Sequence, residues 1–180
     1  MPFRLPPDLR FEPGRGFRIY EGVVSPDWID RNGHMNLVYH RFVFDQATQH
    51  MLRSIGLWDD DNPHGTTFAL EDHVIYRREL MLGQSFFVTY QLLDHSEKLI
   101  HAFLRLFAEP KTGGAPPTLA AVTEHIGCYV DRRTRRSAPM PAAFTTLLRE
   151  IRRLQAGLPD PPERGRVIGI RRRSPVPATA

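Results

Sequence analysis

The feature that most constrains the fold is a run without glycine or proline, residues 36–55. Such a run favours one long helix, and Gly56 directly after it is typical of a helix C-terminus. The apolar residues of the run lie on more than one side of a helix, which predicts a helix buried on most sides. They are Leu37, Val38, Phe42, Val43, Phe44, Ala47, Met51, Leu52 and Ile55. Another element must therefore wrap around this helix.

The β-rich segments supply the wrapping element. FRIYEGVV (17–24) precedes the helix and ends at the turn-forming pair Ser25-Pro26. Four further β-rich runs follow the helix: 67–80, 85–93, 99–107 and 118–130. Because short connections join antiparallel neighbours, this order predicts an α+β fold, with a five-stranded antiparallel sheet wrapped around the long central helix.

The remaining segments complete the expected organisation. Residues 142–155 place apolar side chains at helical spacing and predict a C-terminal amphipathic helix. We expect residues 1–16 to be an irregular N-terminal arm, 17–156 a single domain that includes this helix, and 157–180 a Pro- and Arg-rich tail. An open sheet leaves strand edges unpaired, so a homodimer or a tetramer is expected.

Composition narrows the functional classes. Hydrophobic residues make up 41% and charged residues 24% of the 180 residues, which is ordinary for a globular domain. The sequence contains no apolar run of membrane-spanning length, and its proline-rich N-terminus lacks the apolar core of a signal peptide. The single cysteine, Cys128, fits a reducing compartment. We therefore expect a cytoplasmic protein with no membrane partner.

The positive charge is concentrated near the C-terminus. The chain carries a net charge of +4, whereas residues 149–173 hold eight arginines against Glu150, Asp160 and Glu163. Nucleic-acid binding usually requires basic residues spread over a folded face with aromatic residues among them. An excess confined to a Pro-rich segment is more typical of a solvated tail, so no nucleic-acid partner is expected.

Polar residues crowd the point where the first strand meets the long helix, in DRNGHMNLVYH (30–40). A simple connection needs only a turn residue and an N-cap, yet this segment combines an acid, a glycine, a histidine and two asparagines. Gly33 permits a tight turn, and Asn36 precedes the helix as an N-cap residue would. This segment is the leading candidate for a functional site.

Together with the order of elements, the segment DWIDRNGHMNLVYHRFVFDQA (27–47) resembles hotdog-fold acyl-CoA thioesterases of the 4-hydroxybenzoyl-CoA thioesterase type. Within that superfamily the chain is most similar to the betainyl-CoA thioesterase branch. Two residues depart from the branch pattern, Arg31 and Leu37, and both bear on the choice of acyl group. The residues that carry the branch resemblance are Asp27, Trp28, Ile29, Asp30, Asn32 to Asn36, Glu71, His73, Tyr76, Ala120, Glu124 and Gly165 to Ile168.

The resemblance implies hydrolysis of a short or polar acyl-CoA, with betainyl-CoA as one candidate, without a metal or a cofactor other than the CoA of the substrate. Asp30 then acts as nucleophile or as general base, and the helix N-terminus supplies the backbone N–H of Asn36 or Leu37 to the oxyanion. Gly33 lets the backbone approach the ligand at this point. His34 orients Asp30, donates a hydrogen bond to the substrate, or fills a structural role by binding a buried carbonyl. Asn36 caps the helix, contacts the substrate, or does both.

Other candidate residues come from later segments. Glu71 and His73 share one face of a predicted strand; they belong to the site if that face meets the helix and are surface residues otherwise. Glu71 would then act as a catalytic residue, across a dimer if the partner supplies it. Arg132 and Arg133 suit CoA phosphates, and Arg77, Arg78 and Lys98 are further candidates. The aromatic candidates for binding the acyl group are Trp28, Tyr39 and Trp58.

Two other functions remain open on the sequence. Hotdog enoyl-CoA hydratases use a loop of the form D-x-N-P-x-H, whereas here Asp30 to His34 lacks the proline and brings the histidine one residue closer. A non-catalytic acyl-CoA-binding module of the same fold is the second alternative. Free-thiol release from acyl-CoA separates the thioesterase from both.

Overall fold

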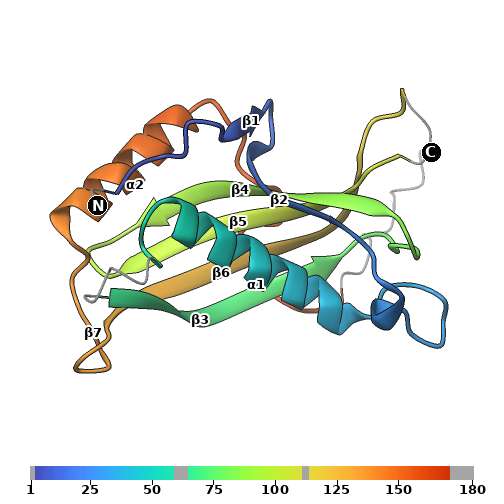
Figure 1. The fold of residues 1–180 in the computed structure, drawn as a ribbon, viewed down its shortest axis with the longest axis horizontal. Coiled ribbons are helices and arrows are strands. Elements are labelled where there is room, and N and C mark those ends of the chain that lie inside the picture. Colours follow the sequence, from blue (N-terminus) through green and yellow to red (C-terminus); the bar gives the residue numbers. More distant parts are fainter. Residues whose placement is uncertain (1–2, 59–64, 111–113, 171–180) are drawn as a thin grey trace, which may run out of the picture.

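The computed structural model describes residues 3–58, 65–110 and 114–170 (Figure 1). It contains one sheet, two α-helices and a single turn of 3-10 helix, η1 (Pro26–Trp28). The helices are α1 (Leu37–Ser54) and α2 (Ala142–Leu154). The strands are β1 (Arg10–Glu12), β2 (Gly16–Val23), β3 (Gly65–Tyr76), β4 (Ser85–His95), β5 (Leu99–Ala108), β6 (Thr118–Asp131) and β7 (Arg136–Ser137). No helix within the described ranges is both long and apolar enough to cross a membrane.

The sheet is antiparallel and runs in the order β1-β2-β4-β5-β6-β3, with β7 paired to β6. Helix α1 lies along one face of the sheet, and α2 packs against the far end of β4 (Figure 1). The predicted α+β hotdog fold is therefore confirmed, with both helices within one residue of their expected ends. Two short strands extend the five predicted ones, and β1 lies inside the segment that we expected to be an irregular arm.

The position of β3 differs from the expectation that short breaks join neighbouring strands. The expectation holds for β4 and β5, which pair with each other, but β3 pairs with β6 and not with β4. The connection from β3 to β4 instead follows the loop before α1, where Met35 N–H donates to Leu80 O at 2.8 Å. Among the described residues, β3 consequently has one unpaired edge.

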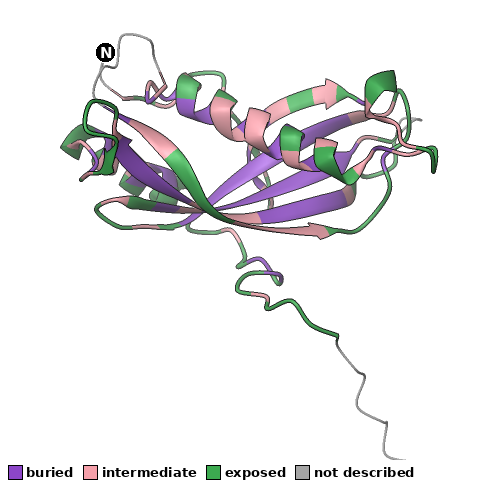
Figure 2. Cartoon of the chain, turned by 90° about the horizontal axis from the view of Figure 1, so that it is seen from below, coloured by how far each residue is buried: buried purple, intermediate pink, exposed green. Residues whose placement is uncertain are grey.

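Helix α1 is buried on one side only. Val43, Phe44 and Ala47 are almost fully buried against the sheet, whereas Leu37 and Val38 are about 60% exposed. Figure 2 shows the sheet buried beneath the helix and exposed positions along the helix itself. The expectation of a helix buried on most sides is thus wrong for a single protomer, because the sheet curves around only half of it.

The C-terminal segment covers part of the opposite face of the sheet. Buried Gln155 accepts a hydrogen bond from Leu92 N–H at 2.8 Å and donates to Tyr90 O at 2.9 Å. Farther along, Gly165 N–H donates to Glu124 Oε2 at 2.7 Å. At least part of the predicted tail is therefore attached to the domain; residues 171–180 lie outside the described residues.

Asp72 joins three elements on the helix side of the sheet. Its carboxylate accepts hydrogen bonds from Arg41 of α1 at 2.7 Å and from His125 Nδ1 of β6 at 2.8 Å. Burial acts to raise the pKa of Asp72, but the hydrogen bond from His125, with the positive charges of His125 and Arg41, holds the pKa below its usual 3.8. This network fixes β3 relative to α1.

Asp72→Asn should lower the free energy of unfolding by about 1–2 kcal/mol at pH 7, because a charged acceptor is lost. A carboxylate with a lowered native pKa stabilises the fold above its unfolded pKa, and this stabilisation is lost as pH falls through the native value. The difference between variant and wild type should therefore shrink on acidification. Urea denaturation from pH 2 to pH 7 measures it, with Asp45→Asn as a control, and a difference that is constant with pH would contradict this role.

Candidate active site

A cleft of about 470 Å³ opens at the N-terminus of α1. It is formed by the loop before α1, the first turn of that helix, and the segment where β3 ends and continues toward β4. The residues that line it are Asp30, Asn32, His34, Met35, Asn36, Leu37, His40, Tyr76, Arg77, Arg78 and Glu79. The fold thus gathers most of the polar motif of residues 30–40 in one depression.

The loop that carries Asp30 is a tight turn closed by two backbone hydrogen bonds. Asp30 N–H donates to His34 O at 3.1 Å, and Gly33 N–H donates to Asp30 O at 3.0 Å. Gly33 adopts a φ of 83°, a left-handed conformation that other residues reach only with strain. A Cβ at this position would meet no described atom within 4 Å. The glycine is therefore required by the backbone angle and not by a close approach of neighbouring atoms.

The Asp30 carboxylate is held by its own loop. Its Oδ1 accepts a hydrogen bond from Asn32 N–H at 2.8 Å, and the Asn32 side-chain amide lies 3.5 Å from Oδ2. His34 Nδ1 lies 4.0 Å from Oδ1, too far for a hydrogen bond, while its Nε2 lies 3.7 Å from Glu79 Oε1. Asp30 is 19% exposed and thus accessible from the cleft. His34 lies beside the acid without binding it directly.

The helix start offers one unused backbone donor. Asn36 is the N-cap, as its position in the sequence predicts, and its side chain accepts from Val38 N–H at 3.0 Å. The N–H of Asn36 itself donates to Trp28 O at 2.9 Å. Leu37 N–H makes no hydrogen bond within the described part of the chain. Of the two donors suggested by the sequence, Leu37 is therefore the one available to an oxyanion, supported by the helix dipole.

His40 is a residue of the cleft that sequence reasoning missed. It is 4% exposed, its Nδ1 lies 3.3 Å from Asn36 O, and its ring meets Tyr76 edge-on at 5.3 Å. Burial lowers the pKa of His40, and the positive charge of His34 acts in the same direction. The Nε2 atom is buried without a partner among the described residues. The only signal in the sequence was its place one turn after Asn36, which does not reveal its burial.

Glu71 and His73 do not join Asp30. They point away from α1, because Asp72 between them occupies the position that faces the helix. Both line a separate depression of about 620 Å³ with Glu124, His101 and the segment 165–168. Of the two alternatives that the sequence leaves open, a single protomer therefore shows the one in which this face does not meet the helix.

Four of the proposed binding residues also lie elsewhere, namely Trp28, Tyr39, Arg132 and Arg133. The rings of Trp28 and Tyr39 stack on each other with centroids 5.5 Å apart, and neither side chain lines the cleft. Arg132 and Arg133 lie in the turn between β6 and β7, at the end of the sheet opposite to the N-terminus of α1 (Figure 1). Arg77 and Arg78, two of the further candidates for CoA phosphates, do line the cleft, and Arg77 is bound to Glu163.

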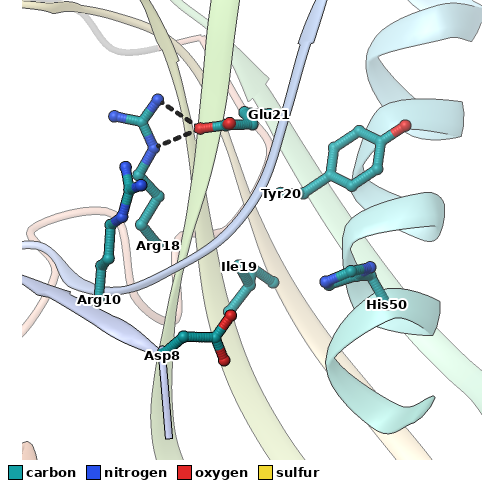
Figure 3. Close-up of a pocket in the computed structure, with 7 residues that line it drawn as sticks. All are labelled: Asp8, Arg10, Arg18, Ile19, Tyr20, Glu21 and His50. Atoms are coloured by element: carbon teal, nitrogen blue, oxygen red, sulfur yellow. Dashed lines mark hydrogen bonds and ion pairs between the residues drawn. The ribbon is translucent and has the colours of Figure 1, made fainter. Parts of the chain in front are cut away.

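A third depression, of about 350 Å³, lies near the C-terminal half of α1, where the N-terminal arm meets β2. Figure 3 shows Tyr20 of β2 and His50 of α1 on one side of it, and Arg18 bound to Glu21 on the other. Arg18 also binds Glu109 at 2.7 Å. Since this arginine is already neutralised by acids, the depression is a weaker candidate than the Asp30 cleft.

Comparison with known proteins gives three consistent findings. Residues 24–148 match the family model described as the thioesterase-like superfamily. The chain is 32% identical to the betainyl-CoA thioesterase of Pseudomonas aeruginosa over 84% of this chain and 93% of that protein. It is 30% identical to an L-carnitine dehydrogenase/betainyl-CoA thioesterase of Rhizobium meliloti, of which it spans 30%.

Two solved structures share the fold closely. A Staphylococcus aureus protein in complex with CoA is 30% identical, with a TM-score of 0.75 over 84% of this chain and 94% of that one. A structure described as a putative thioesterase from Pseudomonas putida is 27% identical, with a TM-score of 0.73 over 87% and 98%. The resemblance inferred from the residues is thus confirmed at the level of the superfamily.

Gly33→Ala should destabilise the protein by about 1–2 kcal/mol through its left-handed backbone angle alone. Gly157→Ala is the matched control, because Gly157 has no positive φ and a Cβ there would meet no neighbour within 4 Å. Chemical denaturation of both variants measures the difference. Equal stabilities would show that the turn before α1 does not require the glycine.

Proposed function

This chain belongs to the thioesterase-like superfamily, and we propose that it hydrolyses a short or polar acyl-CoA in the Asp30 cleft. The observation that carries the proposal is the presence in one cleft of a partly exposed carboxylate, Asp30, and an unused helix N-terminal donor, Leu37 N–H. Thioester hydrolysis needs these two elements, an attacking or proton-accepting group and an oxyanion donor.

In this proposal, the thioester carbonyl oxygen points at the N-terminus of α1. Negative charge develops on that oxygen when the carbonyl carbon is attacked, and Leu37 N–H and the helix dipole stabilise it. Asp30 acts as nucleophile on the carbonyl carbon or as general base toward a water molecule. The hydrogen bond from Asn32 N–H holds Oδ1 in place at 2.8 Å, whereas Oδ2 has only the long contact of 3.5 Å with the Asn32 side-chain amide and is the oxygen available for the reaction.

The charges around the cleft fit a CoA thioester. Arg78 forms no ion pair with another described residue, so its guanidinium is available to a phosphate, while Arg77 is already bound to Glu163. For the acyl end, Tyr76 and Glu79 offer an aromatic ring and a carboxylate, which are the groups that bind a quaternary ammonium ion. The similarity to betainyl-CoA thioesterases makes betainyl-CoA the first substrate to test.

A homodimer is part of the proposal. Edge strand β3 carries exposed apolar residues, with Leu70 61% and Phe68 42% exposed, and the outer side of α1 adds Leu37, Val38 and Phe42. A long unpaired edge beside exposed apolar side chains is a typical site of strand pairing between protomers. A two-fold axis at β3 would join two sheets edge to edge and cover the exposed side of α1.

The proposed activity is tested by free-thiol release from a panel of acyl-CoAs that includes acetyl-CoA and betainyl-CoA. Wild type should release thiol from at least one member, and Asp30→Asn should lower kcat by a factor of about 100 or more, because the amide is a poor nucleophile and a poor base. Asp27→Asn, an exposed acid of η1, is the matched control and should keep full activity. No thiol release by wild type, or full activity of Asp30→Asn, would contradict the proposal.

The dimer is tested by light scattering after size exclusion. Wild type should elute with about twice the protomer mass of 20.7 kDa. Leu70→Lys should shift the protein toward the monomer, because it buries a charge in the proposed contact. Val23→Lys is the control, since Val23 is 54% exposed on β2, away from the β3 edge. A monomeric wild type would refute the β3 contact.

A further inference from the structure

We propose that His40 is the general base that takes a proton from the hydrolytic water, which assigns the nucleophilic role to Asp30. This inference rests on the proposed thioesterase function and on three observations. His40 lines the same cleft as Asp30, its hydrogen bonding fixes which ring nitrogen carries the proton, and its other ring nitrogen is buried without a partner among the described residues.

The tautomer follows from the contact at Nδ1. This atom lies 3.3 Å from Asn36 O, the carbonyl one turn earlier in the chain. A carbonyl oxygen only accepts hydrogen bonds, so Nδ1 carries the proton and donates it. In the neutral ring Nε2 then holds a lone pair, which makes it a hydrogen-bond acceptor and a base.

The Nε2 atom is an exception to the pairing of buried polar groups. Leaving such an atom without a partner costs free energy, and native proteins rarely do so without a functional reason or a bound water. Three other buried side-chain atoms among the described residues also lack a partner, in Trp58, Thr89 and Thr123. None of those residues lines the Asp30 cleft. His40 is therefore the unpartnered group next to the proposed chemistry.

The surroundings keep His40 uncharged near neutral pH. Burial has the largest effect and lowers the pKa of His40. The hydrogen bond to Asn36 O raises this pKa, and the positive charge of His34 lowers it further. The titratable and charged groups that share the cleft are Asp30, His34, Tyr76, Arg77, Arg78 and Glu79. A neutral imidazole is the form that accepts a proton, so its activity as a base rises with pH through a pKa below 6.5.

The reaction then has two steps. Asp30 attacks the thioester carbonyl carbon, the C–S bond breaks, and CoA leaves as a thiolate while an acyl-aspartyl anhydride forms. Water next attacks the anhydride as its proton passes to His40 Nε2, and cleavage of the C–O bond releases the free acid and regenerates the Asp30 carboxylate. The proton on His40 finally passes to the thiolate, and the second water proton leaves from the product acid.

The test is pre-steady-state thiol release by His40→Gln with the best acyl-CoA of the panel. We expect a burst of one thiol per protomer, because the first step is intact, and then turnover slower than wild type by a factor of about 100 or more. His50→Gln is the matched control, since His50 is exposed on the same helix outside the cleft. Asp30→Asn should show no burst.

Turnover of His40→Gln at the wild-type rate would overturn the assignment, and so would slow turnover without a burst. In wild type, kcat should fall at low pH as His40 becomes protonated. This fall should be absent in His40→Gln and present in a His34→Gln variant. If wild type releases no thiol from any acyl-CoA, the proposed function fails and the role of His40 fails with it. A failure of the His40 assignment alone would leave thiol release by wild type intact.

A second measurement uses the wild-type protein, so it tests the proposal even if His40→Gln does not fold. Long-range 1H–15N correlation spectra of 15N-histidine-labelled wild type report the tautomer of each ring. We expect a proton on Nδ1 and none on Nε2 of His40 at pH 7.5. A proton on Nε2 would overturn the proposal, because that atom would then have no lone pair to accept the proton of water.

Discussion

The hydrogen bond from Asn36 N–H to Trp28 O, 2.9 Å long, holds the candidate site together. It closes the loop that carries Asp30 and sets the point at which α1 begins. A second bond, from Met35 N–H to Leu80 O at 2.8 Å, attaches the same loop to the connection between β3 and β4. The loop before α1 and the distant segment around Leu80 thereby converge on the helix N-terminus, where the Asp30 carboxylate, the Leu37 N–H and the His40 imidazole share one cleft.

Much of the fold follows from the sequence alone. The run 36–55 predicts α1 because it lacks breakers, and alternating β-rich segments predict the five long strands. The polar motif around Asp30 also predicts the location of the cleft, since a turn glycine and an N-cap residue fix where the helix starts. These features are local, and local backbone preferences are strong there. The superfamily resemblance predicts the same sheet and the same central helix.

Features that depend on long-range pairing escape such reasoning. Residue alternation puts Glu71 and His73 on one face, but only the contacts of Asp72 decide that this face points away from α1. Arg132 suits a phosphate by its chemistry, yet the hairpin that carries it lies at the far end of the sheet. His40 was missed for a related reason. It is a candidate because it is buried and one of its ring nitrogens has no partner among the described residues, and a sequence motif indicates neither property.

The central claim is that acyl-CoA binds at the N-terminus of α1 and not at either of the other depressions. An amide 1H–15N titration of the wild-type protein with CoA tests it most directly, because each backbone amide reports its own contact. The account predicts the largest shifts at Leu37 and Arg78, with little change at Glu124 or His50. Shifts centred on Glu124 or His50, with Leu37 unmoved, would contradict it.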